Sequence, residues 1–467
     1  MKFLLLSFAE KWKEYKLIEY SPGSSSAFPP LGLEYLAAAL EAENHKVEII
    51  DFGAEEISQN AMEKSIKNSD VVGINVNSNN YENVNKITNK IKGLDDEKPI
   101  IIGGPHCTFL KNRSLSDIPH ADIAVIGEGE HTIIDLVDYF EGRNKISNIN
   151  GVYYRDGDNI KTGKPLKIIK DLDFLSFPAR HLVYKYDYGN ISGGYKCKKK
   201  FTTMITSRGC PFKCRFCARY SNILKDYGFR ERSAENVVEE IQELDDKYGS
   251  IMIVDDNFLA DNKRAHRIFD LLLDIGTDID LLIMGARADL PDKKLYKKMK
   301  KANVKFIGYG IESGNQETLD FYNKNLTLKQ IQETVRLGRK MGFFTLGTFI
   351  LGAPIETKEH IEKTIEFACS LPLDVALFGR LHYQMWSDLW IEAVKNKKIY
   401  EEDYIVPADA RQGLGNLTIE ELKEYEKKAF KQFYWRPRYI ISEVYRAILR
   451  RDFSLLKNGP KYLNSFK

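Results

Sequence analysis

Short apolar runs alternate with amphipathic stretches along the first 145 residues. Runs rich in β-branched residues predict buried strands at 2–7, 47–51, 70–75, 100–103 and 124–126. Helical spacing of apolar residues predicts helices between them, at 32–43, 81–93 and 132–140. Continuous apolar strands that alternate with helices are typical of a parallel sheet covered on both faces. We therefore expect an α/β, doubly wound, Rossmann-like domain over residues 1–145.

A second alternation of apolar runs and amphipathic stretches covers residues 196–380. Its apolar runs predict six strands, at 201–207, 251–255, 281–286, 304–310, 343–351 and 374–378. Six strand–helix units are too few to close an eight-stranded barrel. We therefore expect a partial (β/α)6 barrel with its chemistry on the loops that follow the strands. Residues 146–195 are predicted to form a connector with a β-hairpin, and residues 381–467 a helical region that is strongly periodic over 417–434.

The composition changes this picture little. At 467 residues the chain is long enough for two or three domains. A net charge of +3 gives no reason to expect nucleic-acid binding or a strong overall attraction to anionic membranes. The apolar run at 1–9 is followed at once by charged residues without a small-residue cleavage site, which favours a strand over a signal peptide. Because no apolar stretch approaches the roughly 20 residues that span a bilayer, we expect a cytoplasmic protein with reduced thiols and no transmembrane segment.

Three of the six cysteines, Cys210, Cys214 and Cys217, lie within eight positions directly after the first strand of the second half. Thiolates are soft ligands that select zinc or iron–sulfur clusters. Three ligands leave one metal position open for chemistry, whereas a closed structural site uses four. The alternatives are buried structural thiols, or a zinc site completed by a distant residue. No second Cys-x-x-Cys or nearby Cys/His pair supplies that fourth ligand.

The Cys-x3-Cys-x2-Cys spacing, with the aromatic Phe216 before the last cysteine, resembles the signature of radical S-adenosylmethionine (SAM) enzymes. The resemblance implies that the three cysteines ligate three irons of a [4Fe–4S] cluster, and that SAM chelates the fourth. It also implies that one electron cleaves SAM to methionine and a 5′-deoxyadenosyl radical. A flavodoxin- or ferredoxin-type protein would then be the electron donor.

Short motifs after the other predicted strands resemble further elements of the same family. The resemblance assigns Asp255 and Asp256 to the SAM ammonium, and Arg287 to its carboxylate. It assigns Glu312 and Ser313 to the ribose, and Gly352 and Pro354, in a GxIxGxP-like element, to the adenine. Taken singly, each motif has a structural alternative: an Asp pair at a strand end is more often a helix cap, and a Glu beside Gly is usually a turn. Their order, each at its own strand end, favours the functional interpretation.

Three segments of the first domain resemble the N-terminal domain of cobalamin-binding radical SAM proteins. They contain Leu31 and Gly32; Gly103, Gly104 and His106; and Gly127, Glu128 and Gly129. The resemblance implies that Gly103 and Gly104 allow close approach to cobalamin and that the loop before Gly32 lines the corrin edge. The alternative is a doubly wound domain that binds nothing, or only a partner protein.

The Asp-x-His-x-x-Gly motif, which supplies a histidine to cobalt in many cobalamin proteins, is absent from the sequence. His106 follows a Gly-Gly-Pro turn, where we expect a backbone hydrogen bond in place of a cobalt bond. We therefore expect bound cobalamin with its own base displaced and no histidine below the cobalt.

The last 37 residues, 431–467, contain nine Lys or Arg and two Asp or Glu. Residues 433–439 resemble the C-terminal motif of a cobalamin–radical SAM group that includes anaerobic magnesium-protoporphyrin ester cyclases and C-methylases. We expect a helical face laid on the barrel with solvated charges outside. The alternative is a basic surface for an anionic substrate, an acidic electron carrier or lipid headgroups.

Together these resemblances imply a cobalamin-dependent radical SAM enzyme that methylates an unactivated carbon of an unknown substrate. One alternative keeps both cofactors for an oxidative cyclisation or a rearrangement without methyl transfer. Another is a non-catalytic cobalamin or iron–sulfur sensor, although a sensor needs no nucleotide pocket of the ribose and adenine type.

Overall fold

The structure is a computed structural model that describes residues 1–8, 28–55, 57–189, 191, 195, 197–224, 226–289, 291–450 and 453. It divides the chain into two compact units, residues 1–189 and 190–467. Of the basic C-terminal stretch predicted over 431–467, residues 451, 452 and 454–467 lie outside the described residues. None of the helices in the described part of the chain has both the length and the apolar character needed to cross a membrane.

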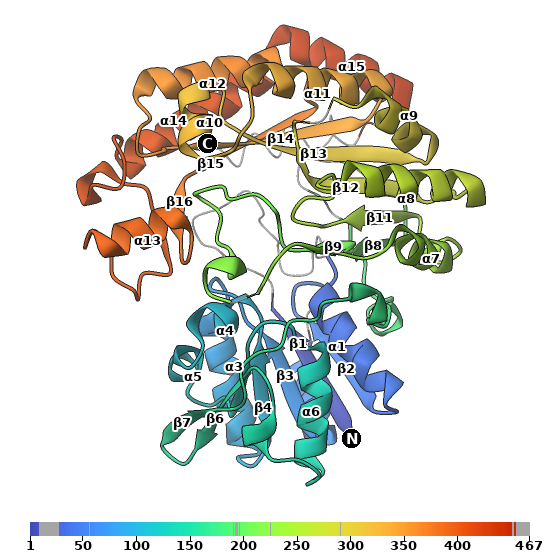
Figure 1. Ribbon diagram of the computed structural model, residues 1–467, viewed down its shortest axis with the longest axis vertical. Helices are drawn as coiled ribbons and strands as arrows, with labels where there is room; N and C mark the ends of the chain where they lie inside the picture. The colour runs from blue at the N-terminus through green and yellow to red at the C-terminus, as the bar shows by residue number, and fades with distance from the viewer. Residues whose placement is uncertain are drawn as a thin grey trace. The chain divides into compact units, whose positions relative to one another are not determined.

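The first unit is built on a seven-stranded sheet with the order β2-β1-β3-β4-β5-β6-β7 (Figure 1). The first five strands are parallel: β1 (Lys2–Ser7), β2 (Lys46–Asp51), β3 (Val71–Asn75), β4 (Ile100–Gly103) and β5 (Ile123–Val125). The hairpin predicted in the connector forms β6 (Val152–Asp156) and β7 (Asn159–Thr162), which extend the sheet antiparallel to β5. The chain order changes direction between β1 and β3, and such switch points are where ligands bind in doubly wound sheets.

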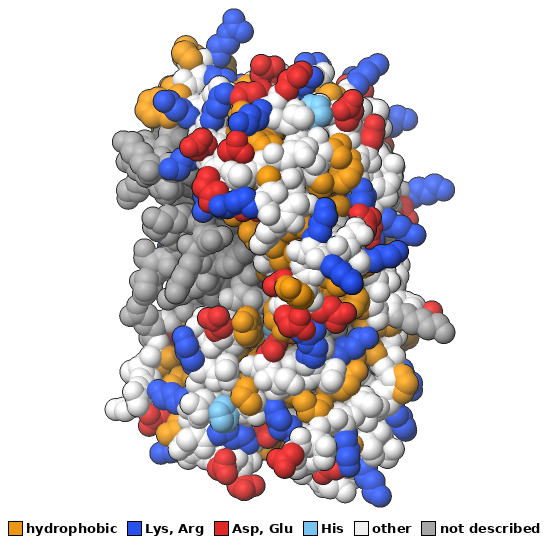
Figure 2. Space-filling model, turned by 90° about the vertical axis from the view of Figure 1, so that its left-hand side faces the viewer, with side chains coloured by type: hydrophobic (Ala, Val, Ile, Leu, Met, Phe, Trp, Pro, Cys, Tyr) orange, Lys and Arg blue, Asp and Glu red, His pale blue; other side chains and the backbone are white. Residues whose placement is uncertain are grey.

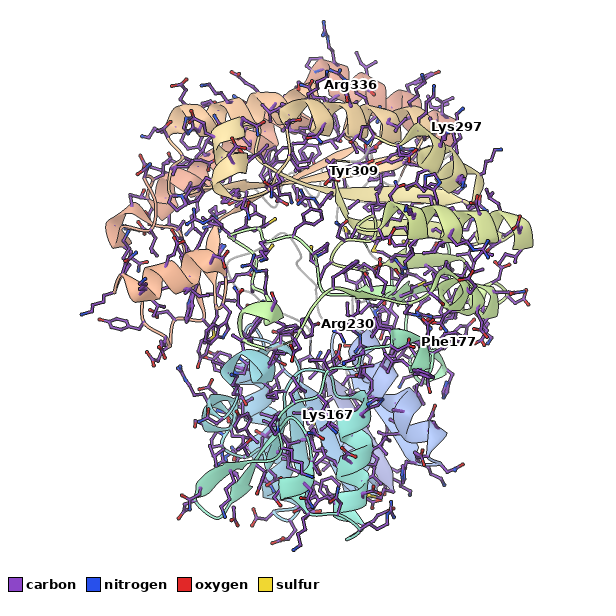
Figure 3. The ribbon with its side chains drawn as sticks, in the orientation of Figure 1. Lys167, Phe177, Arg230, Lys297, Tyr309 and Arg336 are labelled. Atoms are coloured by element: carbon purple, nitrogen blue, oxygen red, sulfur yellow. The ribbon has the colours of Figure 1, made fainter. Side chains whose placement is uncertain are left out.

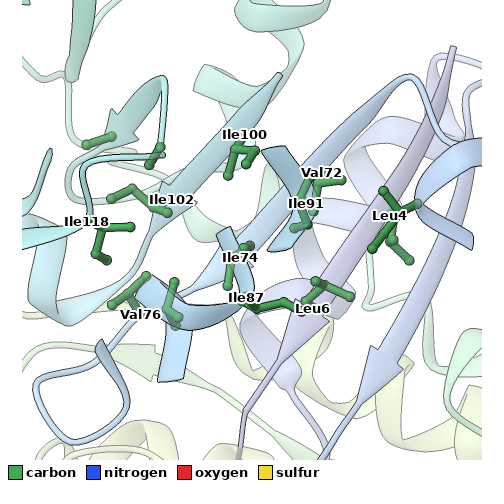
Figure 4. Close-up of a cluster of buried hydrophobic side chains, with 14 of the residues drawn as sticks. Leu4, Leu6, Val72, Ile74, Val76, Ile87, Ile91, Ile100, Ile102 and Ile118 are labelled. Atoms are coloured by element: carbon green, nitrogen blue, oxygen red, sulfur yellow. The ribbon is translucent and has the colours of Figure 1, made fainter. Parts of the chain in front are cut away.

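Helices cover both faces of this sheet, so the unit has two hydrophobic cores. One core packs α2 (Gln59–Asn68) and α3 (Tyr81–Leu94) on β1, β3 and β4, with Leu6, Ile74 and Ile91 among its members (Figure 4). The other packs α1 (Leu31–Ala42) and α6 (Glu130–Phe140) on the opposite face, around Phe3, Ile101 and Leu136. Short helices α4 (Pro105–Leu110) and α5 (Arg113–Asp117) follow β4. The predicted doubly wound domain is confirmed.

The second unit contains a six-stranded parallel sheet with the order β15-β14-β13-β12-β11-β8. Its strands are β8 (Phe201–Met204), β11 (Ser250–Ile253), β12 (Asp280–Arg287), β13 (Val304–Glu312), β14 (Phe344–Leu351) and β15 (Val375–Arg380). Helices follow the strands in turn: α7 (Ala234–Leu244), α8 (Asn262–Ile275), α9 (Lys293–Lys301), α10 (Gln316–Phe321), α11 (Leu328–Met341) and α12 (Lys358–Ser370). All six predicted strands are present in sequence order, which confirms the open, partial barrel.

Buried aromatic side chains join the sheet of the second unit to its helices. Tyr309 of β13 is fully buried, and its hydroxyl lies 3.1 Å from the hydroxyl of Tyr296 on α9 (Figure 3). The region after β15 begins with a small sheet of β16 (His382–Gln384) and β17 (Ile405–Pro407) and with α13 (Asp388–Lys395). It continues with α14 (Ile419–Tyr434) and α15 (Pro437–Arg450). Phe430 and Phe433 of α14 pack on Phe378 of β15, so the expected helical face on the barrel is confirmed for α14.

Candidate functional site

The cysteine loop, residues 209–217, follows β9 (Ser207–Arg208), just beyond the carboxyl end of β8. Contacts with α10, α13 and the segment after α10 hold it in place. The backbone N–H of Arg215 donates to the Tyr322 carbonyl at 3.0 Å, and the Arg215 carbonyl accepts from the Leu389 N–H at 3.1 Å. The Arg215 guanidinium also pairs with both carboxylate oxygens of Glu392, at 2.7 and 2.6 Å. The loop is therefore fixed on its outer side.

The thiols of Cys214 and Cys217 lie together in this loop, and Cys214 is buried. A hydrogen bond from Cys217, with further help from Lys324 and Arg287, lowers the pKa of the Cys214 thiol to about 6. The same hydrogen bond and burial raise the pKa of Cys217. Cys210 is exposed, and no three Cys, His, Asp or Glu side chains of the described residues form a ready-made metal site. The structure thus brings two of the three cysteines together.

Arg287, at the end of β12, lies against the cysteine loop. Its guanidinium stacks over the Phe212 ring at 3.7 Å, and Nη1 lies 4.0 Å from the Cys214 sulfur. The remaining nitrogens donate to the Asp289 carboxylate, at 2.8 Å, and to the Lys324 carbonyl. Arg287 was predicted to meet the SAM carboxylate; here it places a positive charge beside Cys214 and links the loop to the barrel.

A buried ion pair lies next to Arg287, which donates to the backbone carbonyl of one of its members, Lys324. Glu312, the last residue of β13, accepts from Lys324 Nζ at 2.7 Å, and both side chains are buried. Lys324 Nζ also lies 5.8 Å from the centre of the Phe216 ring, which packs edge-on against Tyr322. Lys324 carries no motif signal, because its role depends on a partner twelve positions away. Sequence reasoning missed it.

Ser313, predicted with Glu312 to bind the ribose, is fully buried and already hydrogen-bonded. Its hydroxyl lies 3.0 Å from the Thr364 hydroxyl of α12 and accepts from the Asn315 N–H at 3.1 Å. These bonds fix the turn after β13. In the structure, Ser313 therefore supports the backbone beside Glu312.

Asp255 and Asp256 follow β11 and do not cap a helix. Asp255 is buried and accepts from the Thr206 N–H at 2.6 Å and from the Ser207 hydroxyl at 2.7 Å. Burial raises the pKa of Asp255 despite these bonds. Helix α8 is capped by Asp261, so the helix-cap alternative is wrong for this pair. Asp255 fixes the backbone between β8 and β9, which leads into the cysteine loop, while Asp256 remains exposed.

Gly352 and Pro354 follow β14 in a turn that is fixed by Glu356. Gly352 has a φ of 100°, and a Cβ there would lie 2.7 Å from the Leu422 side chain, so only glycine fits. The Glu356 carboxylate accepts from the N–H groups of Gly352, at 2.7 Å, and Ala353, at 2.9 Å. Glu356 is fully buried, and burial raises its pKa to about 7. Sequence reasoning missed Glu356, which resembles an ordinary turn residue.

In the first unit the predicted glycines lie at the carboxyl ends of β4 and β5. Gly104 has a φ of 110°, and a Cβ there would lie 2.3 Å from the Asn75 side chain, at the end of β3. Gly103 lies beside Val125 in the neighbouring strand. A Cβ on Gly127 would lie 2.6 Å from Leu166, and one on Gly129 would lie 3.0 Å from Leu36. The chain's own packing therefore requires small residues at this edge of the sheet.

The remaining residues predicted in the first unit have different surroundings. His106 is buried, stacks on Tyr81 at 5.1 Å, and its Nε2 lies 3.2 Å from the Asp117 carboxylate. Its Nδ1 lies 3.4 Å from the Ser78 hydroxyl. The buried Glu128 carboxylate accepts from the Ile169 N–H at 2.9 Å. Leu31 is buried at the first position of α1, whereas Gly32 is exposed.

Two family models match the chain, one in each unit. The B12 binding domain model matches residues 24–137, and the Radical SAM superfamily model matches residues 204–368. Each match includes the predicted site residues of its unit.

Similar proteins cover most of the chain. An uncharacterized methyltransferase of Pyrococcus horikoshii is 31% identical over 89% of this chain and 90% of its own length. The cytidylyl-2-hydroxyethylphosphonate methyltransferase of Streptomyces wedmorensis is 27% identical over 86% of each chain. Among solved structures, the radical SAM methyltransferase TsrM from Kitasatospora setae shares the fold, with a TM-score of 0.67 at 17% identity over 84% of this chain and 76% of its own.

Proposed function

This chain belongs to the cobalamin-binding radical SAM family, and we propose that it transfers a methyl group from SAM to an unactivated carbon of its substrate. The observation that carries the proposal is the match, over nine-tenths of both chains, to a relative named as a methyltransferase. Matches to a B12 binding domain and to the radical SAM superfamily in one chain supply the two cofactor classes that this reaction needs.

We propose Cys210, Cys214 and Cys217 as the ligands of a [4Fe–4S] cluster. The donor set fits: two thiols are adjacent, and Arg287 and Lys324 offset the negative charge that thiolates bring. When bound, the cluster, SAM and cobalamin together supply an electron, a carbon radical and a methyl group. Binding of the cluster would bring the exposed Cys210 together with the other two thiols.

The SAM residues that we propose are Asp255, Asp256, Phe216, Arg287, Glu312, Ser313, Gly352 and Pro354. Support comes from their positions at successive strand ends of one sheet. Asp255, Ser313 and Glu356 act by holding backbone segments, and the Gly352 and Ala353 N–H groups are already bound to Glu356. The Asp256 side chain is exposed and can face a ligand. Glu312 pairs with Lys324, so the carboxylate would contact a ribose only through oxygen positions that Lys324 leaves available.

The cobalamin residues that we propose are Leu31, Gly32, Gly103, Gly104, His106, Gly127, Glu128 and Gly129. Support comes from their positions at the start of α1 and after the carboxyl ends of β4 and β5, the edge of a doubly wound sheet at which ligands bind. His106 is stacked on Tyr81 and lies beside Asp117, which supports a positioning role in place of cobalt ligation. We expect the protein to work in the cytoplasm with a flavodoxin- or ferredoxin-type donor.

Anaerobic reconstitution tests the cluster ligands. We expect the wild-type protein to bind iron and sulfide and to cleave SAM reductively, and Cys214→Ala to lose both properties. Cys369→Ala is the matched control, because this cysteine lies at the end of α12, away from the cysteine loop. A Cys214→Ala variant that still forms 5′-deoxyadenosine would refute the assignment.

SAM labelled in its methyl group tests the reaction. Candidate substrates are chosen from the compounds that enzymes encoded by neighbouring genes make or use. With the true substrate, we expect label in the reaction product as well as in methionine. Label found only in methionine, together with a cyclised or rearranged product, would support the alternative reaction without methyl transfer.

Absorbance titration with cobalamin tests the first unit. We expect binding, and an EPR spectrum of the cob(II)alamin form without nitrogen splitting from a histidine. Splitting from a histidine would overturn the axial-ligand proposal, and absence of binding would overturn the assignment of the domain.

A further inference from the structure

Helix α15 presents a row of apolar side chains to solvent. Of the fifteen large hydrophobic side chains that are exposed in the part of the chain the structure describes, eight lie between residues 435 and 453. Those that expose more than half of their surface are Trp435, Ile441, Tyr445, Ile448 and Leu449. Spacings of three, four and seven residues place Ile441, Tyr445 and Ile448 on one face of the helix. We call these five residues, four on α15 and Trp435 directly after α14, the apolar row.

The opposite face of α15 is anchored to the barrel, so the apolar row cannot turn inward. Arg446 lies 2.5 Å, and Arg450 2.9 Å, from the fully buried carboxylate of Asp374, which directly precedes β15. Arg446 also donates to the carbonyl of Phe343, directly before β14. A fixed helix with an exposed apolar face is unusual for a monomer, because contiguous apolar surface generally marks an interaction site.

The charge that α15 itself exposes to solvent is basic. Glu443 is the only acidic residue of α15, and it is buried, whereas Arg438 is exposed. The sequence beyond the helix, residues 451–467, contains Arg451, Lys457, Lys461 and Lys467 against Asp452 alone. A second copy of the chain would offer the same excess of basic residues and no complementary charge. A surface of anionic lipid headgroups complements them instead.

We propose that α15 docks on a bilayer that contains anionic lipid. Trp and Tyr, which prefer the membrane–water interface, supply two of the five residues of the row. At 1.5 Å per residue the helix is about 21 Å long, too short to span a bilayer, so it lies in the interface plane. The small net charge of the whole chain does not argue against docking, because the basic residues that would attract anionic lipid are concentrated in α15 and in the sequence after it.

The docking surface lies at the opposite end of the barrel sheet from the cysteine loop. Asp374 and Phe343 precede their strands, whereas the cysteine loop follows the carboxyl end of β8. Docking therefore leaves the loops that follow the strands uncovered. We expect changes in the apolar row to alter membrane binding and to leave reductive SAM cleavage unchanged.

Sedimentation of the full-length protein with vesicles tests the proposal. We expect binding to phosphatidylglycerol–phosphatidylcholine vesicles, weak binding to phosphatidylcholine alone, and a loss of at least about tenfold in affinity for Ile441→Gln/Leu449→Gln. Tyr400→Gln is the matched control, because Tyr400 is also a largely exposed hydrophobic side chain but lies outside α15. The blue shift of tryptophan fluorescence on vesicle addition should disappear in Trp435→Phe.

Two results would overturn the proposal. One is no binding to the anionic vesicles, or equal binding by Ile441→Gln/Leu449→Gln when its thermal midpoint matches the wild type. The other is a dimer that Ile441→Gln/Leu449→Gln dissociates without any vesicle binding, which would assign the apolar row to a second copy of the chain.

Discussion

The Glu312–Lys324 pair combines buried charge with backbone strain. Glu312 has a φ of 70°, a left-handed conformation that costs a non-glycine residue roughly 1–3 kcal/mol. Lys324 lies between Asn323 and Asn325, which also have positive φ values, of 53° and 51°, and asparagine tolerates these with little cost. The tight Asn-Lys-Asn turn thus directs the Lys324 ammonium at Glu312, and the ion pair holds the strained residue at the end of β13.

Removing one partner of this pair should therefore cost much more than removing an exposed one. We expect Lys324→Met to lower the free energy of unfolding of the cofactor-free protein by about 3–5 kcal/mol, because it leaves Glu312 buried without a counter-charge. Adding Glu312→Gln should restore part of the loss. Lys329→Met is the control: it removes an exposed pair with Glu333, and should change the stability by less than about 1 kcal/mol. Urea unfolding of the wild type and these three variants measures the differences, and a loss below about 1 kcal/mol for Lys324→Met would contradict the argument.

Glu356 predicts a dependence of stability on pH. Burial raises its pKa from the ordinary 4.5 to about 7, so the folded state holds this proton more tightly than the unfolded chain. The stabilising contribution is full below about pH 4.5 and is lost as the pH rises through about 7. Glu356→Gln keeps an oxygen acceptor for the Gly352 and Ala353 N–H groups without a charge. Relative to the wild type, its unfolding free energy should rise between about pH 5 and pH 8, by up to about 3 kcal/mol.

Urea unfolding at several pH values across this window measures the difference between Glu356→Gln and the wild type. The exposed Glu333→Gln serves as control and should show a flat difference. A difference between Glu356→Gln and the wild type that does not change with pH would contradict the assigned role of burial.

At the scale of elements, α14 and α15 stabilise the last two strands of the open barrel. Helix α14 begins with a capping box, in which Thr418 and Glu421 each accept from the other's N–H. Its Tyr434 hydroxyl donates to the Ala376 carbonyl of β15 at 2.9 Å. The Asp374 carboxylate then joins β15, Thr345 of β14 and the arginines of α15. The prediction that the charged side chains of the C-terminal stretch are solvated is therefore wrong for Arg446 and Arg450, because both pair with the buried Asp374 carboxylate.

Asp374→Asn should release α15. The amide keeps the size of the carboxylate but removes the charge that pairs with Arg339, Arg446 and Arg450, and breaking such a buried network costs about 3–5 kcal/mol. We expect faster proteolysis within residues 435–450 at native conditions, with the protease sites in the first unit unchanged. Asp270→Asn, which removes a more exposed pair with Lys298, is the control. Equal cleavage of α15 in Asp374→Asn and the wild type would count against the anchor.

The elements themselves follow from the sequence pattern, whereas the partners of buried polar groups do not. The strand at 2–7 and the strand at 100–103 were predicted with the bounds that the structure has, because each is a continuous apolar run. Helix α2 was missed because it buries only Met62 and Ile66. The bonds of Asp255 to Thr206, and of Arg287 toward Cys214, join residues 49 and 73 positions apart. Local pattern carries no information about such pairs, so motif resemblance could propose the site residues but not the neighbours that each side chain contacts in the folded chain.

At the scale of the whole molecule, the two cofactor classes are assigned to separate stretches of chain. The B12 binding domain match ends at residue 137 and the radical SAM match begins at 204, within the first and second unit respectively. Figure 2 shows basic and acidic side chains interspersed over one face, in keeping with the small net charge. Recognition of the cofactors therefore depends on local chemistry in each unit more than on a long-range field.

Cobalamin should protect the first unit most. With cobalamin at about 100 times its dissociation constant, mass action stabilises the state that binds it by about 2.7 kcal/mol. In hydrogen exchange followed by mass spectrometry, we expect the largest gain of protection in residues 75–80, 103–110 and 127–131, which follow β3, β4 and β5. SAM without cobalamin should leave these peptides unchanged. Cobalamin-dependent protection that spares all three segments would contradict the proposed site.

The order of the strands along the chain also bears on how the protein is made. All seven strands of the first sheet lie before residue 163, and all six strands of the barrel sheet lie between residues 201 and 380. N-terminal domains generally fold first during synthesis. The first sheet can therefore be complete while the ribosome is still translating the barrel, and the three clustered cysteines emerge from the exit tunnel only after that sheet has every strand it needs. Neither unit waits for a strand from the other, so the first sheet can pair all of its strands before the strands of the barrel are available.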